Sequence, residues 1–344
     1  MNELKAAVIG MGKMGMLHAA ILNSIDNVKV TAVADTEKFV LKFIEKNTSN
    51  IKVYTDYVKM LEQSDLDLVY IATPVHLHIK IAVDCAKRNL HFFVEKPLGR
   101  TSEDCESLCN IINEHNVVNM VGFYLRYSDT FSKAKELLDN GIIGEIKNVK
   151  CSVFQTTILR KGSSWRVKKE QSGGGVLIDL GVHLIDLLLW YFGKIKSVQG
   201  FTEYHQIKDI EDSVKVDMMF ENGIPCSYEA SWNVKNYRLQ ETTLEIEGTL
   251  GKIKVNEDYV KIGYDDPKKI KENSIFYKQT LYKGVPIDIG GPEYTNEDVD
   301  FINSIRNGKQ LELNVLFSRN IHSVIDAIYK SSTTKKLEEV NYIE

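Results

Sequence analysis

The chain has 344 residues, which is long enough for two domains with sizeable hydrophobic cores. Its 43% hydrophobic and 26% charged residues are typical of a globular protein, and the net charge of −4 gives no reason to expect binding to nucleic acid or to a membrane surface. No apolar run reaches the ~20 residues of a membrane span, and the N-terminus has no signal-peptide core. The five cysteines have neither metal-ligand nor disulfide-framework spacing, so we expect reduced thiols, no bound metal and a cytoplasmic location.

The N-terminal residues place a glycine-rich turn between a predicted strand and a predicted helix. Lys5–Gly10 is an apolar run typical of a buried strand, and Met14–Leu22 has a helical pattern. The turn Gly10–Gly15 reads GMGKMG, and the next strand, Val28–Ala34, ends at Asp35, 20 residues after the last glycine. A G-x-G-x-x-G in this context, followed by an acid at that distance, is the dinucleotide-binding fingerprint, and a chance glycine turn is the alternative.

The glycines of this turn have separate expected roles. Gly10 makes the tight turn, Gly12 lets a pyrophosphate approach the backbone, and Gly15 lets the helix pack on the strand. The pyrophosphate would lie at the helix N-terminus beside Lys13 and Met14, because free N–H groups and the helix dipole favour an anion there.

Asp35 is expected to select the cofactor. Its carboxylate would accept hydrogen bonds from the adenosine ribose hydroxyls and would repel a 2′-phosphate. No arginine follows it, and Lys38 is the nearest cation along the chain. We therefore expect NAD to bind more tightly than NADP.

Strands and helices continue to alternate as far as Gly122. The strands are continuous apolar runs, as in parallel sheets covered on both faces. This pattern predicts an α/β fold, a doubly wound parallel (Rossmann) sheet of about 120 residues with ligands at the carboxyl ends of its strands. The further predicted strands are Lys52–Tyr54, Leu68–Ala72, His91–Glu95 and Val118–Gly122, and the helices are Tyr57–Gln63, Leu77–Lys87 and Thr101–Asn113.

Two of these carboxyl ends carry distinctive residues. One strand is followed by Thr73-Pro74 and then His78, and another ends in Glu95-Lys96 before a proline. A lysine between a buried strand and a proline has a restricted backbone and is placed to meet a cofactor. A solvated lysine in a helix-capping loop is the alternative.

After Gly122 the pattern becomes rich in alternating strands. It predicts a C-terminal α+β domain with a large, mostly antiparallel open sheet. We place the domains at 1–123 and 124–344, and we expect Asp258–Lys278 to be a surface excursion. The predicted strands are Lys147–Thr157, Ile195–Gln206, Ser213–Phe220, Pro225–Asn233, Thr242–Glu247 and Lys252–Val255, and the helices are Ser128–Asn140, 174–192, Asn296–Asn307 and Val315–Ser331.

The stretch Ser172–Phe192 combines three glycines with an apolar run whose ionisable residues are Asp179, His183 and Asp186. At about 100° per helical residue these three fall within roughly 60° of one face. Burying them unpaired would be costly, so they either form an internal network or face a cavity that binds something polar. The glycines favour the cavity, because they let backbone come close to a ligand.

Taken together, these motifs resemble the Gfo/Idh/MocA family of oxidoreductases, named for glucose–fructose oxidoreductase, inositol dehydrogenase and a rhizopine-catabolism protein. The resemblance covers essentially the whole chain. Two departures are Val75 and Phe123-Tyr124, which stand where the family commonly has asparagine. The matching residues are the Gly10–Gly15 turn, Ala72-Thr73-Pro74 with His78, Glu95-Lys96-Pro97, Gly122–Tyr127 with Arg126, Trp165-Arg166, and Gly173–Gly175 with Asp179, Gly181, His183 and Asp186.

The resemblance implies that Lys96, Asp179 and His183 are catalytic. Oxidation of a sugar or polyol CH–OH sends a hydride to nicotinamide and the hydroxyl proton to a base, and His183 titrates in the range that suits this base. Asp179 would orient His183, and Lys96 would hold the nicotinamide ribose and polarise the reacting oxygen. The implied cofactor-binding residues also include Thr73, Pro74, His78 and Glu95, and the implied substrate-binding residues include Arg126, Trp165 and Arg166.

The substrate class is less defined than the reaction. The segment 159–169 carries Arg160, Lys161, Arg166, Lys168 and Lys169 in a net-negative protein. Guanidinium groups pair well with carboxylate or phosphate, which favours a nucleotide sugar or uronic acid over a free polyol. A solvated basic loop is the alternative.

Two other functions fit the same fold. One is an NAD-dependent glycosidase that oxidises its substrate only transiently, and the other is a cofactor-binding regulator without turnover. Retention of Lys96, Asp179 and His183 argues against the regulator. We also expect a homo-dimer or homo-tetramer formed through the exposed face of the large sheet.

Overall fold

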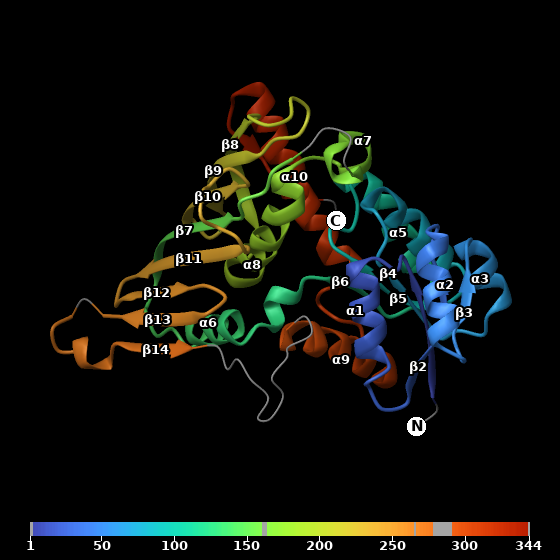
Figure 1. The fold of residues 1–344 in the computed structure, drawn as a ribbon. Coiled ribbons are helices and arrows are strands. Elements are labelled where there is room, and N and C mark those ends of the chain that lie inside the picture. Colours follow the sequence, from blue (N-terminus) through green and yellow to red (C-terminus); the bar gives the residue numbers. More distant parts are fainter. Residues whose placement is uncertain (1–2, 160–163, 265, 278–290, 343–344) are drawn as a thin grey trace. The chain divides into compact units, whose positions relative to one another are not determined.

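The computed structural model describes residues 3–159, 164–264, 266–277 and 291–342 (Figure 1). Its described residues divide into two compact units. The first unit runs to Phe123 and includes the chain from Gly291 to Arg319, and the second comprises the remaining residues from Tyr124 onward. The first unit thus includes a late segment that the sequence analysis assigned to the C-terminal domain, and the division into folding domains stays a prediction.

The first unit contains a parallel sheet in the order β3-β2-β1-β4-β5-β6 among its described residues. Strands are added in opposite directions from β1 and β4, so right-handed crossovers place their helices on opposite faces. This confirms the predicted doubly wound sheet. Its elements are β1 (Leu4–Ile9), α1 (Lys13–Leu22), β2 (Val28–Ala34), α2 (Lys38–Asn47), β3 (Lys52–Tyr54), α3 (Tyr57–Gln63), β4 (Leu68–Ile71), α4 (His78–Ala86), β5 (His91–Glu95), α5 (Ser102–Glu114), β6 (Asn119–Gly122) and α9 (Pro292–Asn307).

The apolar runs explain this sheet. Every residue of β4, in the middle of the sheet, is buried, as the continuous hydrophobic pattern requires of a central parallel strand, and the edge strand β6 is also fully buried. Two helices begin at side-chain caps: Asp56 accepts the N–H of Val58 at α3, and Thr101 accepts the N–H of Asp104 at α5. These caps place the helix starts at the carboxyl edge of the sheet.

The second unit contains a sheet in the order β14-β13-β12-β11-β7-β10-β9-β8-β15 among its described residues. It is mostly antiparallel, with β7 and β10 as a parallel pair, which confirms the predicted architecture. The elements are α6 (Asp129–Asp139), β7 (Ile146–Phe154), α7 (Lys169–Ser172), α8 (Val182–Phe192), β8 (Ile195–Glu203), β9 (Ser213–Phe220), β10 (Pro225–Ser231), β11 (Glu241–Gly248), β12 (Lys252–Val255), β13 (Tyr259–Gly263), β14 (Ser274–Tyr277), α10 (Val315–Thr334), shared with the first unit, and β15 (Glu338–Glu339).

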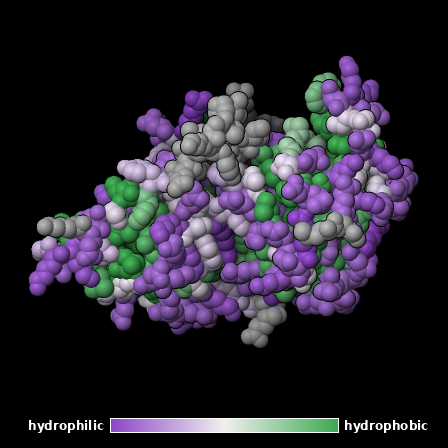
Figure 2. Space-filling view, turned by 90° about the horizontal axis from the view of Figure 1, so that it is seen from below, coloured by the Kyte–Doolittle hydropathy of each residue, from purple (hydrophilic) through white to green (hydrophobic). Residues whose placement is uncertain are grey.

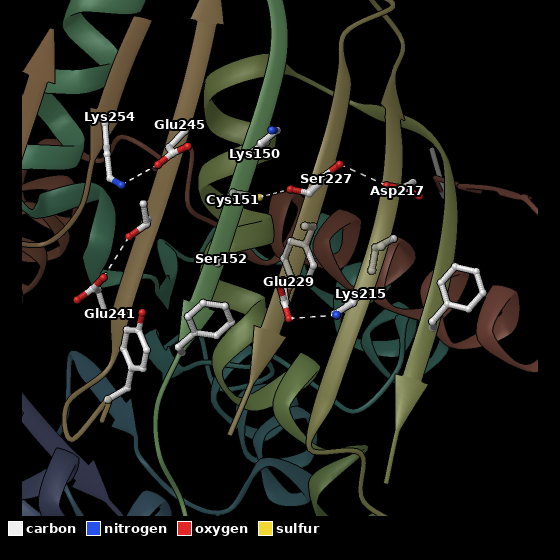
Figure 3. A pocket seen from close by; sticks show the side chains of 16 residues that line it. Lys150, Cys151, Ser152, Lys215, Asp217, Ser227, Glu229, Glu241, Glu245 and Lys254 are labelled. Atoms are coloured by element: carbon white, nitrogen blue, oxygen red, sulfur yellow. Dashed lines mark hydrogen bonds and ion pairs between the residues drawn. The ribbon is translucent and has the colours of Figure 1, made fainter. Parts of the chain in front are cut away.

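The two faces of this sheet differ. Alternate residues of β9 are buried on the face that packs against helices, while Lys215, Asp217 and Met219 lie on the other face. That other face holds a shallow cavity of about 670 Å³ (Figure 3). Its charges are arranged in pairs across neighbouring strands, such as Lys254 with Glu245 at 2.6 Å. The unit therefore has one apolar face covered by helices and one polar open face.

Two sequence-based expectations are corrected. Asp258–Lys278 contains the strand β13 and the edge strand β14. The sequence did not reveal β13 because the apolar alternation of Val260 and Ile262 is short and flanked by charged residues. The predicted helix 174–192 is not uniform, since a π-helical turn over Leu177–Gly181 precedes α8. A period of 3.6 residues cannot reveal such a turn, which is often found at functional sites.

In the described part of the chain, one helical segment, Lys169–Phe192, is long and apolar enough to cross a membrane. Its apolar window is 83% buried inside the protein, as in the core helix of a globular domain. The molecular face in Figure 2 is mostly hydrophilic, with its apolar side chains in separate patches.

Candidate active site

The glycine turn of the first unit has the shape that a dinucleotide requires. Gly10 has φ of +90°, and a Cβ on it would lie 2.5 Å from the carbonyl oxygen of Ala72. A Cβ on Gly15 would lie 1.8 Å from the Gly10 carbonyl oxygen, so only glycine lets α1 pack this closely. By contrast, a Cβ on Gly12 would meet nothing within 4 Å, which leaves open space where a pyrophosphate would approach.

Lys13 and Met14 lie at the start of α1, directly after Gly12. Lys13 is exposed and Met14 is partly exposed, so both can be reached from solvent at the helix N-terminus. This end of α1 has no side-chain cap hydrogen bond in the structure. Its free backbone N–H groups fit an anionic ligand.

Asp35 follows β2 and lines a pocket of about 310 Å³ at the carboxyl ends of β1, β2 and β4. Its carboxylate accepts the N–H of Met11 at 2.5 Å and the N–H of Glu37 at 2.7 Å. A carboxylate has further lone pairs, so Asp35 is held in place and can still accept ribose hydroxyls. A second acid, Asp56, lines the same pocket and was not singled out from the sequence.

The loop after β4 forms another wall of this pocket through Thr73 and Pro74. Within the described residues, the buried hydroxyl of Thr73 has no hydrogen-bond partner, as expected of a group that a ligand would satisfy. His78 is fully buried, with its ring nitrogens 2.7 Å from the Thr73 carbonyl and 2.8 Å from the Pro97 carbonyl. Burial lowers its pKa, and its contacts join the two loops that carry Thr73 and Lys96.

Lys96 follows β5 directly and is partly exposed. Its backbone N–H donates to the neighbouring Glu95 carboxylate at 3.1 Å. The first unit therefore brings together the glycine turn, Asp35, Thr73, Pro74, His78, Glu95 and Lys96 along one edge of its sheet.

In the second unit, the glycine run before α8 is held by a residue that the sequence analysis missed. The buried Glu211 carboxylate accepts the Gly175 N–H with both oxygens at 2.8 Å and the Leu177 N–H at 3.2 Å. The Tyr329 hydroxyl also donates to it at 2.8 Å. A Cβ on Gly175 would lie 1.9 Å from the Glu211 carbonyl oxygen, which explains the glycine. The only hint in the sequence was an acid just before a predicted strand.

Asp179 and His183 lie on consecutive turns of this segment. Asp179 is in the π-helical turn, and its side chain is 27% exposed. His183 is in the first turn of α8 and is 1% exposed, with the Tyr124 ring packed edge-on at 5.0 Å between centroids. The tyrosine that departs from the family pattern thus contacts the predicted base.

Asp186 and Arg126 form a buried ion pair. Arg126 is 6% exposed, and its Nη2 and Nε lie 2.7 Å and 3.0 Å from the Asp186 carboxylate. The guanidinium also stacks on Trp190 at 5.2 Å. The Asp186 carboxylate is thus engaged by an arginine within the second unit.

Arg166 lies beside the predicted catalytic acid. Its Nε is 3.8 Å from Asp179, and its guanidinium lies 4.8 Å from the ring centroid of Trp165. The second unit therefore brings together Trp165, Arg166 and Asp179, and separately His183 with Tyr124. Arg160 and Lys161, part of the predicted basic segment, lie outside the described residues.

The comparison with known families decides the identity. Residues 4–123 match the oxidoreductase family with an NAD-binding Rossmann fold, and residues 131–254 match the Gfo/Idh/MocA C-terminal domain. The chain belongs to the Gfo/Idh/MocA family. This confirms the family and the NAD-binding Rossmann fold that the sequence motifs predicted.

Curated relatives and solved structures are similar to this chain over half of its length or more. Levoglucosan dehydrogenase from Pseudarthrobacter phenanthrenivorans is 26% identical over the full length of both chains. Myo-inositol 2-dehydrogenase from Thermotoga maritima is 27% identical over 56% of this chain and 55% of its own. A solved structure of levoglucosan dehydrogenase in complex with NADH and L-sorbose covers all of both chains, with a TM-score of 0.90 and 25% identity.

Proposed function

We propose that this Gfo/Idh/MocA protein is an NAD-dependent dehydrogenase that oxidises a CH–OH group of a sugar, polyol or nucleotide sugar. The observation that carries the proposal is the pairing of an NAD-binding fold with a buried His183, one turn after the partly exposed Asp179. A buried imidazole beside an accessible carboxylate suits proton transfer from a bound hydroxyl.

The first unit supplies the cofactor site. The open space at Gly12, the free N–H groups of α1 and the unpaired Thr73 hydroxyl fit a dinucleotide. Asp35 would accept the adenosine ribose hydroxyls, and Glu95 and Lys96 would hold the nicotinamide ribose. NAD, when bound, supplies the hydride acceptor.

Protein side chains carry out the proton transfer and stabilise the charges that develop. His183 takes the hydroxyl proton at a ring nitrogen, and Asp179 stabilises the cationic imidazolium that results. Lys96 donates a hydrogen bond to the reacting oxygen and stabilises the negative charge that develops there. Arg166 lies beside Asp179, with its Nε 3.8 Å from the carboxylate.

The pocket chemistry supports NAD over NADP. Two carboxylates, Asp35 and Asp56, line the pocket at the end of β2. A 2′-phosphate there would be repelled by both.

The relatives support a sugar or polyol substrate. One acts on levoglucosan and another on myo-inositol, as their names state. An anionic sugar remains our hypothesis from the basic segment, and Lys168 and Lys169 are its exposed or partly exposed members. Arg166 of the same segment lies beside Asp179, and Arg126 is paired with Asp186, which reduces the positive charge left for a substrate.

The test is an NADH assay against levoglucosan, inositols, free sugars, uronic acids and nucleotide sugars. The proposal expects absorbance at 340 nm to rise in proportion to one of these substrates. Release of an aglycone, or addition of water to the substrate, without net NADH would instead favour transient oxidation. That alternative has a specific support, because a 25%-identical relative is a 2,7-anhydro-N-acetylneuraminate hydratase.

Self-association through the open face of the large sheet is part of the proposal. Phe201, which lines the cavity on this face, and Met219 are exposed on β8 and β9. Light scattering should therefore report a dimer or tetramer. A cytoplasmic location is also proposed, supported by the five buried free cysteines.

A further inference from the structure

One buried histidine of the first unit has no role in the proposed reaction. His18 on α1 is 0% exposed and lies between two acids from other elements. Its Nδ1 is 2.9 Å and 3.0 Å from the two carboxylate oxygens of Asp298 on α9, and its Nε2 is 3.1 Å from Glu95 at the end of β5. A neutral imidazole has one N–H, so only the imidazolium donates to both carboxylates.

The surroundings make this contact strong. The His18 ring lies against Tyr70 and Phe93, at 5.2 Å and 4.9 Å between centroids, and Phe301 packs on both of those rings. Burial lowers the pKa of His18, but the charges and hydrogen bonds of Asp298 and Glu95 outweigh this and raise it well above the usual value. Hydrogen bonds to ionised groups in such a site are stronger than those between neutral groups.

Glu95 links His18 to Lys96, the predicted catalytic lysine, through hydrogen bonds. One of its carboxylate oxygens faces His18, and the other accepts the backbone N–H of Lys96 at 3.1 Å. Burial raises the pKa of the Glu95 carboxyl, but the His18 hydrogen bond and charge outweigh this and hold it below the usual value. A continuous set of hydrogen bonds therefore runs from Asp298 through His18 and Glu95 to the backbone of Lys96.

We infer that His18 and Asp298 are positioning residues, which hold Glu95 and through it the backbone of Lys96 in the orientation that catalysis needs. Neither residue is placed against substrate. The inference rests on the proposed function only for the role of Lys96, because the hydrogen-bonded set is a property of the first unit alone.

The test compares two near-isosteric variants of His18. In His18→Gln the amide nitrogen replaces Nε2 and keeps the donor to Glu95. In His18→Asn it replaces Nδ1 and keeps the donor to Asp298. His18→Gln leaves the fully buried Asp298 carboxylate without its histidine donor. His18→Asn leaves the Glu95 carboxylate without that donor, but the Glu95 side chain is 13% exposed and can be reached by water. His18→Gln should therefore have the lower melting temperature.

Positioning predicts the opposite order for catalysis. We expect kcat to fall roughly tenfold to a hundredfold in His18→Asn and clearly less in His18→Gln. A purely structural role predicts that kcat falls together with the melting temperature, and that result would overturn the inference. His115→Asn and His115→Gln, on a partly exposed histidine of the same unit, should change neither quantity.

Backbone hydrogen exchange in a peptide covering residues 92–96 tests the inference without turnover. The exchange rate should rise in His18→Asn and stay at the wild-type value in His18→Gln. If none of the sugars or polyols supports NAD reduction by the wild-type protein, the proposed function fails. The exchange data still decide whether His18 positions the backbone of Lys96. Equal exchange in both variants would show that His18 does not hold Lys96.

Discussion

The Glu211 carboxylate accepts the Gly175 N–H with both oxygens, at 2.8 Å each, from 36 residues further along the chain. The same carboxylate accepts the Leu177 N–H, so it satisfies backbone donors that the start of a buried helix would otherwise leave unpaired. It also accepts a hydrogen bond from the Tyr329 hydroxyl. A buried anion at a helix N-terminus also complements the helix dipole. This contact holds the backbone directly before and at the start of the π-helical turn that carries Asp179.

We predict that Glu211→Gln lowers kcat about tenfold with a smaller change in KM for NAD. The amide can accept at one position only, and its NH₂ group would oppose the Gly175 N–H. Steady-state kinetics and a melting curve measure both effects. Glu221→Gln, in the exposed β9–β10 turn, is the control and should behave as wild type. Unchanged kcat in Glu211→Gln would show that this cap does not position the helical segment that carries Asp179 and His183.

We predict that His183→Gln lowers kcat by a factor of 10² to 10⁴ and leaves the NAD dissociation constant within about twofold. Glutamine keeps most of the side-chain volume, whereas alanine would leave a cavity at a site that is 1% exposed. Stopped-flow reduction of NAD and fluorescence titration separate the two effects. His205→Gln, at an exposed position in the same unit, is the matched control. Normal turnover in His183→Gln would favour the internal-network interpretation of the helix.

The sequence predicted most of what depends on local patterns. Continuous apolar runs predicted the parallel sheet, which the structure confirms, and the spacing from Gly15 to Asp35 predicted a dinucleotide site at its edge. Long-range partners were not predictable, because nothing near Gly175 in the chain points to Glu211, and His18 and Asp298 are 280 residues apart. The strand β13 was missed because charged neighbours mask its alternation, and the π-helical turn was missed because periodicity assumes a uniform helix.

We predict that the wild-type protein binds NAD at least tenfold more tightly than NADP, and that Asp35→Asn narrows this ratio roughly tenfold. The variant removes the charge that repels a 2′-phosphate and weakens the acceptor for the ribose hydroxyls, while its amide oxygen can still accept the Met11 N–H. Fluorescence titration with both cofactors gives the ratio. Glu37→Gln changes an exposed charge two residues away and should leave it unchanged. Tighter NADP binding by the wild type would contradict the assignment of Asp35.

The last prediction concerns stability and pH. Glu257 lies in the turn between β12 and β13, and its carboxylate accepts the Thr242 N–H at 2.7 Å and 2.9 Å. Burial outweighs these hydrogen bonds and raises its pKa to about 7. The folded state therefore disfavours the ionised form relative to the unfolded state.

The direction of the pH dependence follows from the linkage between protonation of Glu257 and folding. Below the unfolded pKa of about 4.5 the carboxyl is neutral in both states, and the cost of ionisation is absent. As pH rises from about 4.5 to the folded pKa near 7, the unfolded state ionises while the folded state resists ionisation, so the loss of stability grows and then levels off above pH 7. The full shift would lower the free energy of unfolding by about 3 kcal/mol, and solvent screening of the partly accessible side chain makes the actual loss smaller. Glu257→Gln is neutral at every pH, so denaturant titrations should show it gaining about 1–3 kcal/mol on wild type between pH 5 and pH 8. Glu247→Gln, exposed on β11, should show no such gain, and a pH-independent difference in Glu257→Gln would refute the raised pKa.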